Sequence, residues 1–219
     1  MLALYGHPFS SYTWKAQIAL YEKDLPFDFR ILEADFPEHA AELNAYWPLG
    51  KFPVLVDGAI TRIESSIIIE HLDLHHRGKR QLIPTDTVAA LEVRFMDRVF
   101  DNHVMGMMQA IVGEHIPFIT PSPDMARIER CKALLSTIYA WLDTKIPAQG
   151  WACGADFTLA DCAAAPSLFY ADWVHEIPET LNRLQAYRAR LLARPSVARC
   201  VEDARPYRDY FPLGAPDRD

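Results

Sequence analysis

Two serine hydroxyls stand near the beginning of the chain, where a short apolar run gives way to an amphipathic segment. Ser10 and Ser11 follow Gly6-His7-Pro8 and open a pattern typical of a helix over residues 11–23. A serine at a helix N-terminus can cap free backbone N–H groups, and the same helix end favours a bound anion. The two serines can therefore be plain helix caps, or one hydroxyl can donate a hydrogen bond to a thiolate docked there. The GxSxG motif of serine hydrolases is absent from the sequence, which disfavours hydrolysis.

The thiolate hypothesis is energetically adequate. Lowering a thiol pKa from about 8.5 to about 6.5 requires about 2.7 kcal/mol. A charge-assisted hydrogen bond supplies about 1.5–3 kcal/mol, and a helix N-terminus supplies about 0.3–1 kcal/mol more. One serine hydroxyl at this position could thus hold a bound thiol ionised near neutral pH without a separate general base.

Two further features follow in the same half of the chain. Lys51-Phe52-Pro53 places a proline at the start of a short apolar strand, where a missing N–H group is tolerated. A cis bond before this proline would turn the preceding backbone groups outward to pair with an extended peptide, whereas a trans bond at a loop-to-strand junction is the ordinary alternative. Glu64-Ser65 opens an apolar helix. There the serine could bind a carboxylate and the glutamate an ammonium, or the pair could simply cap the helix.

The elements around these residues alternate between strand and helix. The patterns predict strands over 2–5, 27–32, 54–56 and 59–63 and helices over 11–23, 38–46 and 65–75. Asp57-Gly58 between the last two strands is a strong hairpin signal. The order βαβαββα predicts one mixed sheet, with a right-handed parallel crossover at its start and an antiparallel hairpin at its edge.

The composition changes after residue 78. Arg77-Gly78-Lys79-Arg80 indicates a surface linker, and Asp86 is the expected cap of the next helix. The rest of the chain predicts no strand, but helices over 89–114, 125–146, 158–172, 179–192 and 195–204. The tail from Pro206 onward mixes aromatic residues with charges and prolines. This composition is compatible both with a tail that packs on the protein and with one that frays. We interpret the chain as an α/β domain over 1–78 and an all-helical domain over 87–219.

Composition excludes several classes of protein. The 219 residues are 50% apolar and 23% charged, as in an ordinary soluble globular protein with one or two cores. The net charge of −7 and the lack of a Lys/Arg block argue against nucleic acid as a partner. No window is apolar and long enough for a membrane span, and the N-terminus lacks a secretory signal. Because the cysteines show no CxxC spacing, we expect reduced, buried thiols in a cytoplasmic protein; they are Cys131, Cys153, Cys162 and Cys200.

In this order and spacing, Gly6-His7-Pro8-x-Ser10, Lys51-Phe52-Pro53 and Glu64-Ser65 resemble the glutathione-binding half of cytosolic glutathione transferases. The first helical segment resembles that of serine-type members, notably the phi and zeta classes. Phe157-Thr158-Leu159-Ala160-Asp161 is similar to the capping box of the family, which we interpret as structural. The resemblance covers the whole chain and implies a thioredoxin-like βαβαββα domain followed by an all-helical domain. Tyr12 stands where zeta members carry a cysteine, which argues against a maleylacetoacetate isomerase.

The resemblance also implies a role for each matching residue. Ser10 would stabilise the glutathione thiolate, with Ser11 as the alternative. The other implied contacts to glutathione are Lys51, Phe52, Pro53, Glu64, Ser65 and His39. Among them the proline would carry the cis bond, and the adjacent glutamate and serine would receive the γ-glutamyl unit.

A second substrate, a small apolar electrophile, would lie between the two domains. The candidate residues are apolar or soft side chains near the first helix or along residues 89–114, namely Phe9, Tyr12, Met105, Met107, Met108, Ile111, His115 and Phe118. A stripe of this kind at helical spacing is equally typical of a core. Since the first half of the chain has no cysteine, active-site-cysteine chemistry is excluded. The reactions that remain possible are conjugation, peroxide reduction and isomerisation, each with glutathione as the nucleophile.

The resemblance therefore implies a glutathione transferase of small apolar electrophiles, acting in detoxification as a cytoplasmic homodimer with glutathione as co-substrate. A non-catalytic binding or scaffold relative is the alternative from another class, and an isomerase or dehalogenase is the alternative within the family.

A metal site is not expected. His71, His75 and His76 are close in sequence, and positions i and i+4 share a helix face. However, no acidic third ligand is evident from the sequence, and the HExxH pattern is absent. Imidazoles in a last helical turn also interact favourably with the helix dipole without any metal.

Overall fold

The structure, a computed structural model, describes residues 1–76 and 78–219, so Arg77 of the expected linker lies outside the described residues. The first part of the chain forms a sheet with the strand order β2-β1-β3-β4. Its strands are β1 (Leu2–Gly6), β2 (Phe27–Ile31), β3 (Val54–Asp57) and β4 (Ile60–Ile63). β1 pairs in parallel with β2 and antiparallel with β3, and β3 pairs antiparallel with β4. The predicted mixed sheet with an edge hairpin is confirmed.

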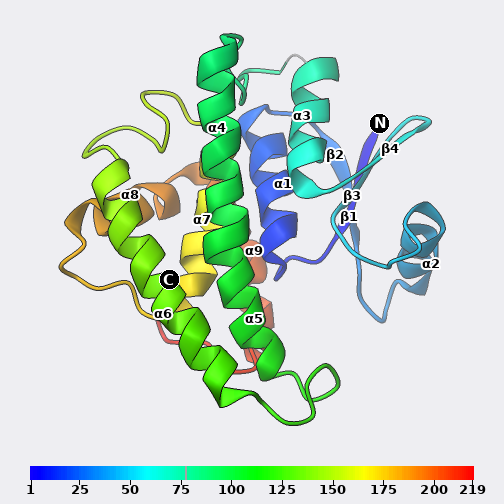
Figure 1. Cartoon of the computed structure of the whole chain (residues 1–219). Coiled ribbons are helices and arrows are strands. Elements are labelled where there is room, and N and C mark those ends of the chain that lie inside the picture. Colours follow the sequence, from blue (N-terminus) through cyan, green and yellow to red (C-terminus); the bar gives the residue numbers. More distant parts are fainter. Residues whose placement is uncertain (77) are drawn as a thin grey trace.

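Three helices accompany the sheet: α1 (Ser11–Glu22), α2 (Pro37–Tyr46) and α3 (Ser65–His75). In Figure 1, α1 and α3 lie between the sheet and the helical remainder, and α2 lies on the outer side. Alternate side chains of a strand point to opposite faces of a sheet. Leu4 and Leu55 accordingly enter the main core with α1 and α3. Their neighbours Tyr5 and Val54 form a small second core with Leu43 of α2.

The remainder is helical in the part of the chain that the structure describes, apart from an isolated bridge between Trp151 and Gly154. Its elements are α4 (Thr87–Val99), the π-helical η1 (Phe100–Met105), α5 (Gly106–Glu114), α6 (Met125–Lys145), α7 (Leu159–Val174), α8 (Asn182–Leu192), α9 (Pro195–Ala204) and the 3-10 helix η2 (Arg205–Tyr210). Every residue of α7 is buried, and this helix packs against α1, α4, α5 and α8. One continuous core therefore joins the sheet helices to the helical part.

The start of α7 carries the expected capping box. The Asp161 carboxylate accepts hydrogen bonds from the backbone N–H of Thr158 at 2.8 Å and from its hydroxyl at 3.0 Å. The Tyr187 hydroxyl donates to the same carboxylate at 2.6 Å. Burial raises the pKa of Asp161, and these hydrogen bonds oppose that rise. This cluster lies in the core, as expected of a structural cap.

The helix predicted over 89–114 differs from the observed structure. It begins at Thr87, capped by Asp86, and its middle changes to the π-helical register of η1 before α5 resumes the α-helical register. The change lies next to a buried ammonium: Lys15 of α1, which is 1% exposed, contacts carboxylate oxygens of Asp97 at 2.5 Å and Asp101 at 2.7 Å. Hydrophobic periodicity gives no sign of such a register change, which occurs in proteins mostly as single turns near functional sites.

The C-terminal tail packs against the helical part. Phe211 is 5% exposed, and its ring lies 5.1 Å from that of Trp173. The Tyr207 hydroxyl donates to Glu33, which follows β2. The four cysteines are free thiols, but Cys153 is only partly buried, so the expectation of burial was wrong at that position. Within the described ranges, none of the helices combines the length and apolarity that crossing a membrane requires.

Candidate functional site

The loop between β1 and α1 is held tightly in place. A Cβ added at Gly6 would come within 2.6 Å of the Thr13 side chain, so this position requires glycine. The indole N–H of Trp14 donates to the Pro8 carbonyl at 2.5 Å, and the Tyr170 hydroxyl donates to the Phe9 carbonyl at 3.0 Å. These contacts fix the backbone directly ahead of the two serines.

Both serines lie at the start of α1, but they have different partners. Ser10 is the N-cap, and its Oγ accepts the Thr13 N–H at 3.3 Å. Ser11 is 3% exposed, and its Oγ accepts from the Gln109 side chain at 3.1 Å. Since a hydroxyl that accepts a hydrogen bond still has its own proton to donate, either serine can stabilise an anion.

A polar pocket of about 270 Å³ lies between the sheet and the start of η1. It collects five residues that the sequence analysis assigned to glutathione: Lys51, Phe52, Pro53, Glu64 and Ser65. The Phe52–Pro53 peptide bond is cis, as the resemblance implied. Glu64 precedes α3 with φ at 65°, and its side chain is exposed, whereas Ser65 is 6% exposed.

The helical part adds residues that the sequence analysis did not assign to this pocket. From the helical part these are Arg98, Asp101 and Asn102, and the sheet part also contributes Tyr12 of α1 and Trp47 at the end of α2. Arg98 contacts a carboxylate oxygen of Asp101 at 2.6 Å. The same carboxylate oxygen meets the buried ammonium of Lys15. Positive and negative side chains thus face the pocket together, which suits a ligand that carries both an ammonium and carboxylates.

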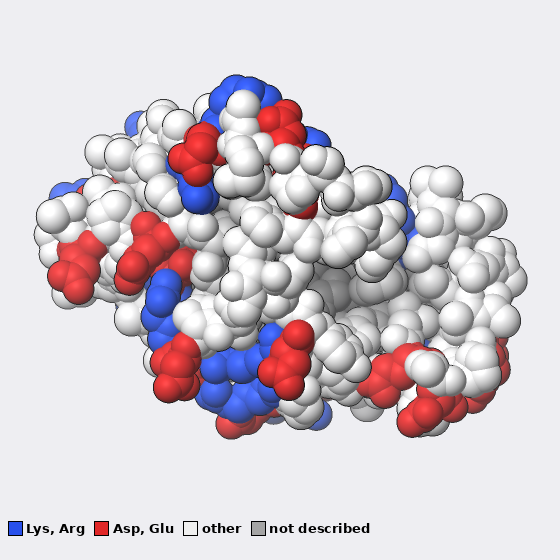
Figure 2. All heavy atoms as spheres, turned by 90° about the horizontal axis from the view of Figure 1, so that it is seen from below, with Lys and Arg blue, Asp and Glu red and all other residues white. Residues whose placement is uncertain are grey.

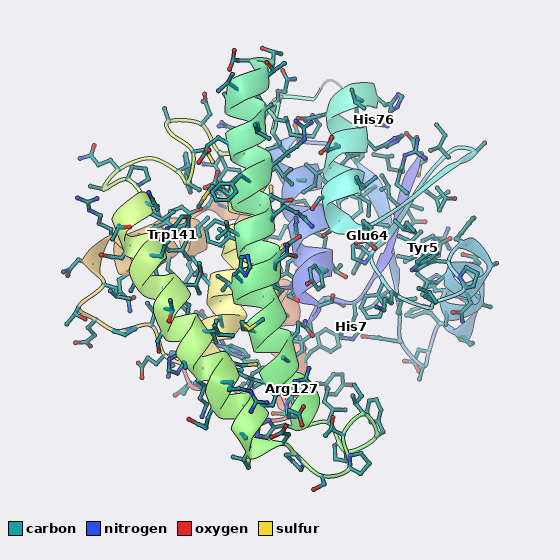
Figure 3. The ribbon with its side chains drawn as sticks, in the orientation of Figure 1. Tyr5, His7, Glu64, His76, Arg127 and Trp141 are labelled. Atoms are coloured by element: carbon teal, nitrogen blue, oxygen red, sulfur yellow. The ribbon has the colours of Figure 1, made fainter. Side chains whose placement is uncertain are left out.

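A second pocket, of about 310 Å³, is mainly apolar and lies on the other side of Phe52. It contains both serines together with His7, Phe9, Phe52, Met108, Gln109, Val112, Ile116, Tyr170, Tyr210, Phe211 and Pro212. Figure 3 places His7 where the sheet part meets the helical part. From below, the surface is hollowed between the two parts, and the surface around this hollow is mostly uncharged (Figure 2). Phe52 lines both pockets, so the two are adjacent.

Only some of the residues predicted for the electrophile line the apolar pocket. Phe9 and Met108 do so. Tyr12 lines the polar pocket instead. Met105 and Ile111 are at most 1% exposed and belong to the core. Each residue along a helix turns by about 100°, so a stripe of apolar residues predicts a buried face without telling which part of it meets a cavity.

Four further predictions about pocket residues are corrected by the structure. Met107 lines a groove between α4 and α6, and His115 lines neither of the two pockets. Phe118 is 89% exposed in the loop after α5. His39 is buried in α2, where its Nδ1 lies 2.7 Å from the Ile31 carbonyl, and it does not reach the polar pocket.

The residues that sequence analysis missed carried weak signals. Arg98 and Asp101 are two of several charges along residues 89–114, so their type alone does not single them out as a partner surface for the polar pocket. Tyr210 and Phe211 lie in the tail whose packing the sequence left open. Nothing in the sequence around Tyr170 distinguishes it from a core residue.

Burial shifts the pKa of two groups at the site. Burial raises the pKa of Tyr12 to about 12, so its phenol stays neutral at working pH. Burial also lowers the pKa of His7, although Glu33 opposes this shift. The His7 Nδ1 accepts the Phe9 N–H at 3.1 Å, which keeps the ring in one orientation.

The fold and the site together define a class of protein. A thioredoxin-like sheet with a cis proline beside a polar pocket is joined to a helical part that completes the pocket, which is the two-part architecture that the resemblance implied. Comparison with known families agrees. Residues 4–80 match the glutathione S-transferase N-terminal domain, and residues 125–190 match the glutathione S-transferase C-terminal domain. The chain belongs to the cytosolic glutathione S-transferase family.

Its relatives carry several names. The chain is 28% identical to the stringent starvation protein A homolog of Coxiella burnetii, with 90% of this chain and 89% of the relative covered. It is 26% identical to FtsZ-localized protein A of Caulobacter vibrioides (93% and 92% covered) and 26% identical to glutathione S-transferase GstB of Escherichia coli (92% and 98% covered). A glutathione S-transferase of Methylobacillus flagellatus, solved with glutathione bound, is similar with a TM-score of 0.76 and 25% identity, over 91% of this chain and 98% of that one.

Proposed function

We propose that the protein binds glutathione in the polar pocket, stabilises its thiolate at Ser10, and directs it at a small apolar electrophile in the apolar pocket. The observation that carries this proposal is that Phe52 lines both pockets. A tripeptide whose cysteinyl unit pairs with the Phe52 backbone has its sulfur next to the serine-lined wall of the apolar pocket.

The charges of the polar pocket fit glutathione, which carries one ammonium and two carboxylates. Glu64 and Asp101 are the acceptors for the ammonium. Ser65 at the start of α3 and the cations of Lys51 and Arg98 are the partners for the carboxylates. Asp101 is held by Lys15 and Arg98, so its carboxylate is fixed in place before the ligand arrives.

Ser10 suits the thiolate better than Ser11 because it is the partly exposed N-cap of α1. Its Oγ accepts the Thr13 N–H, so its proton points away from the helix and toward a ligand. Ser11 is buried and receives the Gln109 amide, which makes it the second donor. A charge-assisted hydrogen bond of about 1.5–3 kcal/mol accounts for most of the ionisation energy of the thiol.

The apolar pocket brings the electrophile close to the sulfur of glutathione. Its aromatic and aliphatic walls remove an apolar electrophile from water and hold it against the sulfur. The rate enhancement then comes from a higher thiolate fraction and from the pairing of two bound reactants.

Calorimetry with reduced glutathione and a conjugation assay with an aromatic halide test the proposal. Ser10→Ala should lower kcat/KM by roughly 10–100-fold and move the pH midpoint of activity upward, because the thiolate loses a donor worth about 1.5–3 kcal/mol. Ser11→Ala should have a smaller effect. Ser122→Ala, at an exposed serine in the loop before α6, is the matched control and should change nothing. Unchanged kinetics and pH midpoints in both active-site variants would exclude this role for the serines.

A non-catalytic binding protein is the second candidate. Two relatives of similar identity are named for FtsZ localisation and for stringent starvation, and their names carry no transferase activity. Binding of glutathione by calorimetry, without turnover of a panel of halides, peroxides and epoxides, would favour this candidate.

We also propose a homodimer. An apolar groove of about 440 Å³ lies between α4 and α6 and includes Phe95, Leu134 and Trp141, the last labelled on α6 in Figure 3. Phe95 is 48% exposed and Leu134 is 54% exposed, which is unusual for large apolar side chains in one groove. Light scattering after gel filtration should give a dimer mass for the wild type and a monomer mass for Phe95→Glu. A monomeric wild type at micromolar concentration would contradict the proposal.

We place the protein in the cytoplasm. The cysteines of the described residues are free thiols, and free thiols persist in a reducing compartment. Cell fractionation with antibody detection checks this location, and a signal confined to an oxidising compartment would contradict it.

A further inference from the structure

Three ligand-type side chains meet at the end of α3 that is remote from the glutathione pocket. Asp57 is the last residue of β3, His71 lies in the last turns of α3, and His76 is the C-cap of that helix. We propose that Asp57, His71 and His76 bind a divalent transition-metal ion of the Zn²⁺ type. The proposal is independent of the transferase function.

The backbone explains why the three residues converge. The Asp57-Gly58 turn begins beside the C-terminal end of α3, since β3 and β4 pack against that helix. His76 is five residues beyond His71, a spacing that does not place both on one face of a regular helix. The chain leaves the helix at His76 with φ −122° and ψ 92°, and this extended conformation turns its ring back toward the aspartate.

The three ligand atoms already lie close together. The Nε2 of His71 lies 2.9 Å from Asp57 Oδ2, and the Nε2 of His76 lies 2.6 Å from the same oxygen. All three ligand atoms lie within 4.8 Å of one another. Zinc–ligand bonds of about 2.0–2.2 Å in a tetrahedral site separate ligand atoms by about 3.3 Å. The carboxylate therefore has to move outward by about half an ångström, which a partly exposed side chain at a turn can do.

Of the three ligands, His71 is buried and held in place, whereas Asp57 and His76 are partly exposed to solvent. His71 is 3% exposed, and its Nδ1 has no hydrogen-bond partner among the described residues. Its ring is therefore held by packing, with Nε2 as its one polar contact. The side chains of Asp57 and His76 are 22% and 26% exposed, so an ion can enter from solvent and keep a water ligand. A set of two imidazoles and one carboxylate with an open position is a known arrangement for zinc and related ions.

The place in the fold also favours a cation. The C-terminal end of a helix carries a partial negative charge. In Figure 3, His76 lies at the upper end of α3 and Glu64 at the lower end. The eleven residues of α3 span about 16 Å, so an ion at this end does not touch the glutathione pocket. Its effect is to join the β3–β4 hairpin to α3 and thereby stabilise the folded chain.

This cluster changes one conclusion from the sequence. A metal site at the histidines was not expected because no acidic third ligand was evident, but Asp57 supplies one through the fold. His75, at the helical i+4 position that the sequence favoured, lies with its ring 4.5 Å from that of His71 but outside the ligand set.

Calorimetry and thermal melting of the full chain, first treated with chelator and dialysed, test the proposal with ZnCl₂ at pH 7.5. The wild type should bind one ion per chain, and its Tm should rise with ZnCl₂ concentration. Asp57→Asn and His76→Gln should each weaken binding by more than about tenfold, since even losing an outer-shell partner costs 10–100-fold in affinity. His75→Gln is the matched control and should bind like the wild type. The visible spectrum of the Co²⁺-loaded wild type should show tetrahedral coordination that Asp57→Asn lacks.

Three outcomes would overturn the proposal. The first is a wild type that takes up no ZnCl₂. The second is binding that survives in both Asp57→Asn and His76→Gln, which would place the ion elsewhere. The third is binding abolished by thiol alkylation and unaffected by the two variants, which would assign it to the cysteines. His76→Gln changes a partly exposed side chain, so it keeps the test valid if Asp57→Asn fails to fold.

Discussion

The polar pocket and the apolar pocket differ in how the chain builds them. The polar pocket takes much of its wall from two short stretches, Lys51-Phe52-Pro53 and Glu64-Ser65, at either end of the β3–β4 hairpin. The apolar pocket combines residues from four distant segments, namely the stretch 7–11 at the start of α1, α5, α7 and the tail. Motifs of adjacent residues therefore indicate the first pocket, whereas the second exists only after distant segments have packed together.

The two pockets also differ in what holds them. Behind the polar pocket, the buried ammonium of Lys15 joins α1 to the carboxylates of Asp97 and Asp101. The apolar pocket is closed by the tail, where Tyr210 is 68% exposed. Substitutions behind the polar pocket should thus affect folding, and substitutions in the tail should affect only the second substrate.

The largest effect is expected at Lys15. Lys15→Met leaves two buried carboxylates with Arg98 as their one cationic partner among the described residues, besides the Ser66 hydroxyl on Asp97, and removing one member of a buried ion cluster costs about 3–5 kcal/mol. Urea denaturation should show this loss in the free energy of unfolding. Lys132→Met, which removes a partly exposed lysine paired with Glu129 at the surface, is the control and should cost less than about 1 kcal/mol. Equal losses in the two variants would show that the buried cluster does not stabilise the fold more than an exposed ion pair does.

An intermediate effect is expected at Glu64. In the proposed function Glu64 accepts the ammonium of glutathione, so Glu64→Gln should raise the dissociation constant for glutathione by roughly tenfold, or about 1.4 kcal/mol. The KM for the electrophile should not change. Calorimetry and initial-rate kinetics measure the two constants separately, and a parallel rise in both would mean that the pockets act as one site.

A smaller effect is expected in the tail. Tyr210→Ala removes an aromatic wall of the apolar pocket worth about 1 kcal/mol, so the KM for an aromatic electrophile should rise roughly fivefold while glutathione affinity stays constant. Phe118→Ala, at an exposed aromatic outside the pocket, is the matched control and should leave both constants unchanged. A larger effect of Phe118→Ala than of Tyr210→Ala would mean that the electrophile binds near Phe118, as the sequence analysis predicted, and not beside the tail.

The smallest effect is expected at Tyr12. Its pKa of about 12 keeps the phenol protonated across the assay range, so Tyr12→Phe removes no group that titrates there. The pH midpoint of conjugation should therefore stay within about 0.3 pH units of the wild type. A clear upward shift of the midpoint would identify Tyr12 as a donor to the thiolate and would weaken the assignment of Ser10.

The sequence predicted the features that depend on near neighbours. The order of strands and helices and the capping box of Thr158 and Asp161 were predicted and are confirmed, whereas the residues around Pro53 left cis and trans open and only the family resemblance implied the cis bond that is present. Which apolar residues of the helix over 89–114 line the pocket was not predictable in the same way. Met105 and Met108 are three residues apart, and both are apolar and buried in the core, yet of the two only Met108 also lines the pocket.

The sequence by itself determined the alternation of elements, the serines that begin α1 and α3, and the proline ahead of β3, because hydrophobic period and capping act over a few residues. The tertiary structure alone decided that Arg98 and Asp101 complete the polar pocket and that Asp57 meets His71 and His76. These partners are far apart in the chain, and which side chains meet depends on the packing of whole helices. Such packing leaves no local pattern in the sequence.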